Sequence, residues 1–169
     1  MALQLEVVSA NGPPALLAMA KALVGEYAAM PHIAGRWATP EADISALPAP
    51  YVLPAGILLV AHEDAEPIGC GALLAFAPGI GEIKRVYVRP QGRGRGVGEA
   101  VTRALINYAE QLGFDRVRLD TAPELLAARA LYERLGFVAI PHYRDGLLPG
   151  TLCFERSVRG VQDGGAGEA

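Results

Sequence analysis

The stretch RPQGRGRGVGEA, Arg89 to Ala100, decides the fold because of what lies on either side of it. The run GEIKRVYV before it is typical of a β-strand, and residues 97–112 after it carry apolar side chains at helical spacing. A glycine-rich turn between a strand and a helix exposes the first helical amides, which have no partners inside the helix and lie at the positive end of its dipole. The stretch therefore predicts a cradle for a phosphate group.

Other interpretations of this stretch fit its surroundings less well. A flexible linker would join two domains, whereas this stretch joins the strongest strand pattern to the strongest helix pattern. The dinucleotide fingerprint GxGxxG needs glycine where Val97 or Glu99 stands, and the Walker loop needs a Lys-Ser/Thr pair. Two alternatives stay open: a tight structural turn with solvated arginines, and an RG-type nucleic-acid contact. The second lacks interleaved aromatic residues for base stacking, and the chain has a net charge of −3.

The composition of the 169-residue chain is that of one globular domain, with 51% hydrophobic and 20% charged residues. Its two cysteines are far apart and form no metal-ligand spacing, so we expect reduced thiols, a cytoplasmic protein and no metal. The N-terminal residues lack the pattern of a signal peptide, and the apolar runs are too short to span a membrane. We expect a domain over residues 1–158 and a disordered tail over 159–169.

Apolar periodicity predicts a mixed α/β order of strand, helices, three strands, helix, strand, helix and strands. Short turns between the three central strands favour a meander. The expected strands cover residues 3–8, 56–63, 67–77, 81–88, 115–121 and 151–158, and the expected helices cover residues 16–30, 39–47, 97–112 and 122–135.

Two motifs on these elements resemble the GNAT acetyltransferase family. Its signature is an Arg or Gln, two residues, a Gly, one residue, then Gly or Ala, and Arg93, Gly96 and Gly98 fill it. The run ARALYERLGF, residues 128–137, is similar to the second family motif. The resemblance covers residues 3–158. It implies a single-domain acyl-CoA N-acyltransferase fold, with a mixed central sheet of about six to seven strands flanked by about four helices.

The resemblance also implies acetyl-CoA as the co-substrate. Backbone amides of the glycine stretch would hold the pyrophosphate, and the strand before it would pair with the pantetheine arm in a gap between the strands at 81–88 and 115–121. Arg89 and Arg95 would either add positive electrostatic potential around the cofactor or contact its outer phosphate. Many family members carry an Asn where Leu125 stands here, so that contact is not expected. The implied cofactor-binding residues are Val86, Tyr87, Val88, Arg93, Gly94, Arg95, Gly96, Val97 and Gly98.

Catalysis in such a site requires a proton donor for the leaving thiolate and a neutral amine. The second motif places Tyr132 as the expected acid, with packing as the alternative. The backbone amide of Val88 is expected to polarise the thioester carbonyl. Glu82 would share a side with Val86 and Val88 in a regular strand and could draw the amine proton through water, or it could only pair with neighbouring cations.

The acceptor is expected to be a small primary amine, acetylated by direct transfer. A carboxylate beside aromatic rings in residues 26–37 would suit a cationic amine. The candidate contacts are Glu26, Tyr27, Trp37 and Tyr143. The alternatives are a peptide or protein amine as acceptor, or a non-catalytic acyl-CoA-binding or regulatory domain on the same fold. No nucleic acid and no membrane are expected as partners, and a homodimer stays open.

Overall fold

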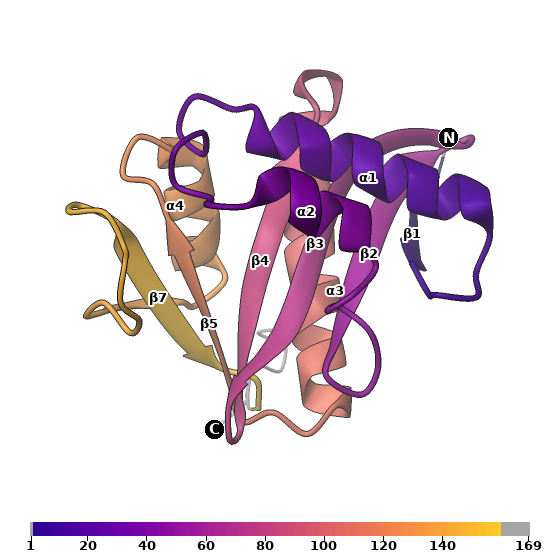
Figure 1. Ribbon diagram of the computed structural model, residues 1–169. Helices are drawn as coiled ribbons and strands as arrows, with labels where there is room; N and C mark the ends of the chain where they lie inside the picture. The colour runs from indigo at the N-terminus through magenta and orange to yellow at the C-terminus, as the bar shows by residue number, and fades with distance from the viewer. Residues whose placement is uncertain (1, 160–169) are drawn as a thin grey trace, which may run out of the picture.

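The computed structural model describes residues 2–159 as a twisted sheet covered by helices on both faces (Figure 1). The sheet has the order β1-β2-β3-β4-β5-β7-β6. Every neighbouring pair is antiparallel except β4 and β5, which run parallel. The strands are β1 Gln4–Val7, β2 Gly56–Glu63, β3 Glu66–Ala77, β4 Ile80–Val88, β5 Arg116–Thr121, β6 Val138–Ile140 and β7 Leu152–Ser157.

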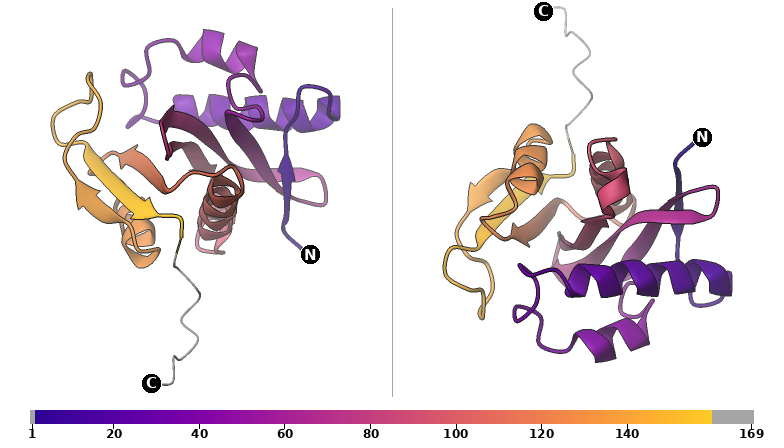
Figure 2. Two further views of the ribbon diagram at one scale, coloured as in Figure 1. Left: turned by 90° about the horizontal axis from the view of Figure 1, so that it is seen from below. Right: turned by 90° about the horizontal axis from the view of Figure 1, so that it is seen from above.

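Helices lie on both faces of the sheet, as the end-on views show (Figure 2). One face carries α1 (Pro14–Ala28) and α2 (Pro40–Ala46), and the other carries α3 (Val97–Gln111) and α4 (Leu126–Arg134). The short 3-10 helix η1 (Pro90–Gly92) leads from β4 toward α3. None of the helices in the described part of the chain has the length and apolar character needed to cross a bilayer.

Burial on both faces explains the unbroken apolar run of β2. Ile57 and Leu59 join the core cluster under α3, whereas Leu58 and Val60 join the cluster under α1. Strands that are covered on both sides read as continuous apolar segments rather than as alternating ones. The sheet therefore separates two cores, and a gap in it connects the two faces.

The predicted fold class is confirmed, with a mixed sheet of seven strands and four α-helices among residues 2–159. Two elements differ from the expectation. The last helix begins at Leu126, because residues 122–125 form a turn in which the Leu125 amide donates to the Ala122 carbonyl at 3.1 Å. Strand β6 has only three residues, too few for apolar periodicity to give its bounds from the sequence. The predicted disordered tail lies almost entirely outside the described residues.

Candidate functional site

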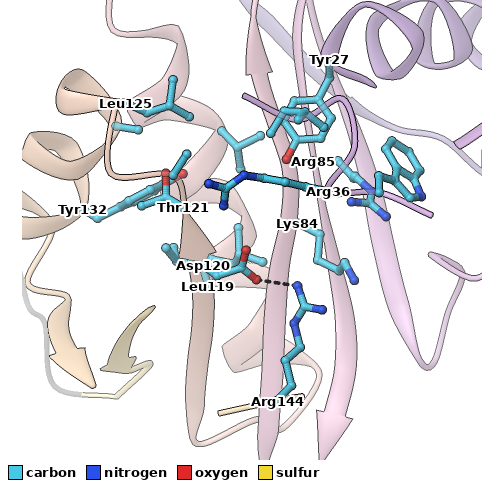
Figure 3. Close-up of a pocket in the computed structure, with 16 residues that line it drawn as sticks. Tyr27, Arg36, Lys84, Arg85, Leu119, Asp120, Thr121, Leu125, Tyr132 and Arg144 are labelled. Carbon is cyan, nitrogen blue, oxygen red and sulfur yellow. Dashed lines mark hydrogen bonds and ion pairs between the residues drawn. The ribbon is translucent and has the colours of Figure 1, made fainter. Parts of the chain in front are cut away.

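The gap in the sheet lies between β4 and β5. The two strands pair only at their first residues, from Ile80↔Arg116 to Glu82↔Arg118, and then separate. A cavity occupies the opening, lined by residues 83–86 of β4 and 119–122 at the end of β5 (Figure 3). It is bounded by α4 on one face and by α1 with its following loop on the other. The cavity is therefore lined by side chains from both faces of the sheet.

A β-bulge in β4 shapes one wall of the cavity. Between the pairs Cys70↔Tyr87 and Ala72↔Lys84, two residues of β4 oppose one of β3. Arg85, in the bulge, has φ of 58°, a left-handed conformation that is uncommon outside glycine. The extra residue reverses the alternation of side chains along the strand.

The glycine stretch forms an open turn at the start of α3. Gly94 and Gly96 have φ of 74° and 78°, and Gly96 is the N-cap of the helix. Among residues 2–159, no group accepts a hydrogen bond from the backbone amides of residues 94–99. Unpaired amides at a helix N-terminus favour an anion. The turn thus has the geometry of an anion cradle, beside the end of β4.

The arginines of this stretch are held by the protein itself. Arg95 pairs with Glu63 at 2.6 Å, and Arg89 pairs with Glu26 at 2.9 Å. The Nε of Arg93 donates to the Val88 carbonyl at 3.1 Å. The Arg93 contact ties the turn to the end of β4, and the backbone amides of the turn stay available as donors to an anion.

Tyr132 lines the α4 side of the cavity and is 7% exposed. Its ring packs against Phe137 and Phe154, with centroids 5.6 and 6.3 Å away. Burial raises the pKa of the Tyr132 phenol well above its ordinary value. The phenol is therefore protonated at neutral pH, as a proton donor must be.

Comparison with known proteins identifies this architecture. The model of the acetyltransferase (GNAT) family matches residues 26–137. The chain belongs to the GNAT family. It is 38% identical over 104 residues to an uncharacterized N-acetyltransferase of Schizosaccharomyces pombe, an alignment that covers 60% of this chain and 64% of the relative. The chain thus spans slightly less than two thirds of that relative.

Another relative and one solved structure agree with the family. The rice protein named "Probable glucosamine 6-phosphate N-acetyltransferase 2" (Oryza sativa subsp. japonica) is 35% identical over 128 residues, covering 69% of this chain and 72% of the relative. The Sinorhizobium meliloti phosphinothricin acetyltransferase, solved in complex with AcCoA, superposes with a TM-score of 0.73 at 20% identity and covers 93% of this chain and 89% of its own. At that identity the structural likeness establishes the fold.

The β4 residues that the family resemblance assigned to the cofactor point to opposite faces of the sheet. Val86 and Val88 pack toward α3, and Val86 lines the cavity. Tyr87 points to the opposite core, where its ring lies 6.4 Å from that of Tyr27. Only the backbone of Tyr87 is therefore open to a ligand in the gap. Leu125 lines the cavity, as its place in the second motif suggested.

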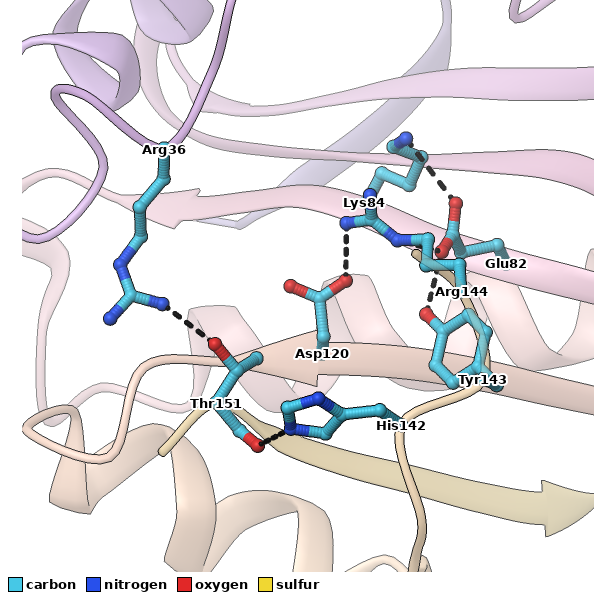
Figure 4. Close-up of polar contacts among 8 residues, drawn as sticks. All are labelled: Arg36, Glu82, Lys84, Asp120, His142, Tyr143, Arg144 and Thr151. Atoms are coloured by element: carbon cyan, nitrogen blue, oxygen red, sulfur yellow. Dashed lines mark hydrogen bonds and ion pairs between the residues drawn. The ribbon is translucent and has the colours of Figure 1, made fainter. Parts of the chain in front are cut away.

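Glu82 does not share a side with Val86 and Val88, because the bulge intervenes. It pairs with Leu74 of β3 on the α1 face, is 4% exposed, and is not part of the cavity lining. Its carboxylate accepts a hydrogen bond from the Tyr143 hydroxyl at 2.6 Å (Figure 4). It also contacts Lys84 Nζ at 3.3 Å and Arg144 Nε at 3.5 Å. Glu82 therefore lies at the centre of a network of polar side chains formed with Tyr143, Lys84 and Arg144.

The expected acceptor residues are only partly brought together. Tyr27 and Trp37 line the α1 side of the cavity. Glu26 pairs with Arg89 and does not line it, and Tyr143 lies behind it, against Phe76 at 5.2 Å. Sequence reasoning missed five charged lining residues, which come from the loop after α1, from β4, from β5 and from the segment before β7: Arg36, Lys84, Arg85, Asp120 and Arg144.

Proposed function

We propose that this chain is an N-acetyltransferase that moves an acetyl group from acetyl-CoA directly to a primary amine. The observation that carries the proposal is the gap between β4 and β5, placed beside an anion cradle of six unpaired amides. The pyrophosphate would accept hydrogen bonds from the amides of residues 94–98. The pantetheine arm would lie along Val86–Val88, where β4 has no neighbouring strand on the β5 side.

The chemistry proposed for this site depends on position and proton supply. The cavity would bring the amine nitrogen and the thioester carbon together between the strands, which supplies much of the rate. The Val88 amide would stabilise the negative charge that develops on the carbonyl oxygen. Tyr132 would give its proton to the leaving thiolate; the phenol is protonated at neutral pH, and its raised pKa makes it a weaker acid than a free tyrosine. Glu82 would accept the amine proton only through water, since its carboxylate is already engaged.

Acetyl-CoA binding tests the proposal first. Acetyl-CoA at a hundred times its Kd should stabilise the fold by about 2.7 kcal/mol and raise the Tm. Gly96→Glu should abolish this shift by steric block and charge repulsion. Gly113→Glu is a matched control, because Gly113 has φ of 85° and, like Gly96, no atom within 4 Å of an added Cβ, but it follows the opposite end of α3.

Release of free CoA in the presence of primary amines tests catalysis. An enzyme releases CoA in proportion to acetylated amine, whereas a non-catalytic acyl-CoA-binding domain shows the Tm shift without release. A Tm that does not respond to millimolar acetyl-CoA would refute the proposal.

A further inference from the structure

The wall of the cavity on the α1 side is strongly basic. Four basic side chains and one acidic side chain line the cavity: Arg36, Lys84, Arg85, Arg144 and Asp120. The chain as a whole has a net charge of −3, so this concentration of positive charge is local. A concave site with charge of one sign attracts ligands of the opposite sign.

Carboxylates of the protein itself neutralise the charge of two of these basic side chains, Arg144 and Lys84. Arg144 pairs with Asp120 at 2.8 Å and approaches Glu82 at 3.5 Å, while Lys84 approaches the other oxygen of Glu82 at 3.3 Å (Figure 4). These pairs form the back of the cavity. Asp120 and Glu82 are engaged in these pairs, so neither carboxylate neutralises Arg36 or Arg85.

Arg36 and Arg85 are not balanced. Arg36 extends from the loop after α1 to Thr151, whose hydroxyl accepts from its Nη1 at 3.0 Å (Figure 4). Arg85 lies over the ring of Trp37, with Cζ 3.6 Å from the centroid. Within residues 2–159, neither arginine forms an ion pair with a carboxylate. Both side chains are half-buried, which makes their uncompensated charge costly.

The same contacts disfavour a cationic group on this wall. The face of Trp37, which could hold a cation, is already covered by the Arg85 guanidinium. Glu26, the carboxylate expected beside it, pairs with Arg89 instead. A carboxylate or phosphate would compensate the two guanidiniums, which donate in the paired geometry that such groups accept.

We propose, on the basis of the proposed acetyl transfer, that the acceptor is a small amine carrying an anionic group, a carboxylate or a phosphate, which binds Arg36 and Arg85. The anionic group would enter from the α1 face. The amine would then point toward the gap between β4 and β5, where the thioester is expected from the α4 face (Figure 3).

Matched pairs of amines test this proposal and separate the two anions. The pairs are phosphoethanolamine with ethanolamine, glucosamine 6-phosphate with glucosamine, and β-alanine with 3-amino-1-propanol, each followed by CoA release. The anionic member of at least one pair should have a kcat/KM at least about 10-fold above its neutral partner, as expected for hydrogen bonds to charged groups. The pairs that show this preference tell phosphate from carboxylate.

Substitution of Arg36 ties the preference to this wall. Arg36→Gln should lower the ratio of anionic to neutral kcat/KM by about 10-fold or more, and Arg36→Lys should restore part of it. Arg159→Gln is the control, because the Arg159 side chain is 71% exposed and, within residues 2–159, its ion pair is with Asp115, at 3.9 Å. It removes the same charge and should leave the ratio unchanged.

A binding measurement covers the case in which no probe amine is acetylated. With the protein saturated by acetyl-CoA, inorganic phosphate or β-alanine should raise the Tm of the wild type and of Arg159→Gln, and should raise it less in Arg36→Gln. Equal turnover of anionic and neutral amines, or anion shifts that are absent or equal in all three proteins, would overturn the proposal. Acetyl-CoA binding would survive that result, whereas its loss would refute the proposed function instead.

Discussion

Gly98→Ala is predicted to stabilise the fold and weaken the binding of acetyl-CoA. An added Cβ at Gly98 would lie 3.5 Å from Leu131 Cδ2 and 3.6 Å from Val88 Cγ2, which are ordinary contact distances. The residue lies in α3 and has no positive φ, so alanine should gain about 0.5–1 kcal/mol from helix propensity. For a chain of this size that corresponds to a Tm increase of about 1–4 °C.

The new methyl group would occupy the space between β4 and α4 at the cradle. An extra methyl in a contact that the bound ligand fills costs about 1–3 kcal/mol, so the affinity for acetyl-CoA should fall by about 5- to 150-fold. Isothermal titration measures the Kd, and thermal unfolding without ligand measures the Tm. Gly25→Ala is the matched control: Gly25 lies inside α1, on the opposite face of the sheet from α3, and has no atom within 4 Å of an added Cβ.

Two results would refute this reasoning. If Gly98→Ala bound acetyl-CoA within about twofold of the wild type, the bare backbone at Gly98 would not contact the ligand. If its Tm fell while that of Gly25→Ala rose, the packing derived for the added methyl would be wrong.

Three further predictions concern titrating side chains. Tyr132→Phe should lower kcat by about 10- to 100-fold and leave the acetyl-CoA Kd nearly unchanged; wild-type turnover would contradict the acid role. Burial opposes ionisation of Glu155, but its hydrogen bonds from Arg118 and Arg116 prevail and hold its pKa below the ordinary value of 4.5. The carboxylate thus stabilises the fold at neutral pH, and this stability is lost as the pH falls through the folded pKa. Glu155→Gln should lower the free energy of unfolding by about 1–3 kcal/mol at neutral pH. In urea unfolding, the variant should also lose less of this free energy than the wild type as the pH falls; an equal loss would contradict the role of Glu155. Burial raises the pKa of the Cys70 thiol to about 12, so Ellman's reagent at mildly alkaline pH should label it only after unfolding; rapid labelling of the native protein would contradict this.

Local sequence signals predicted most of the fold. Strand β2 has the bounds expected from its apolar run, and the open turn with Gly94 and Gly96 at positive φ lies where the glycine stretch was expected to form a cradle. These features depend on nearby residues, through hydrogen-bond periodicity and backbone freedom. The gap between β4 and β5 was expected only from the family resemblance.

The basic wall of the cavity on the α1 side could not be predicted from local sequence signals. Its basic side chains come from the loop after α1, from β4 and from the segment before β7, and only the folded chain brings Arg36, Arg85 and Arg144 together. The bulge carries an arginine rather than a glycine at its left-handed position, so no turn residue marked it. Assuming regular alternation therefore placed Glu82 on the wrong face.

The unpaired amides of residues 94–99 affect how the protein could change its specificity. Main-chain donors are supplied by almost any amino acid, so the proposed grip on the cofactor needs particular residues only where a side chain would block the ligand, as at Gly96 and Gly98. The basic side chains that line the cavity, such as Arg36 and Arg85, can in contrast be exchanged one at a time. Redesign for a new amine could therefore proceed on the α1 face while the acyl donor stays the same.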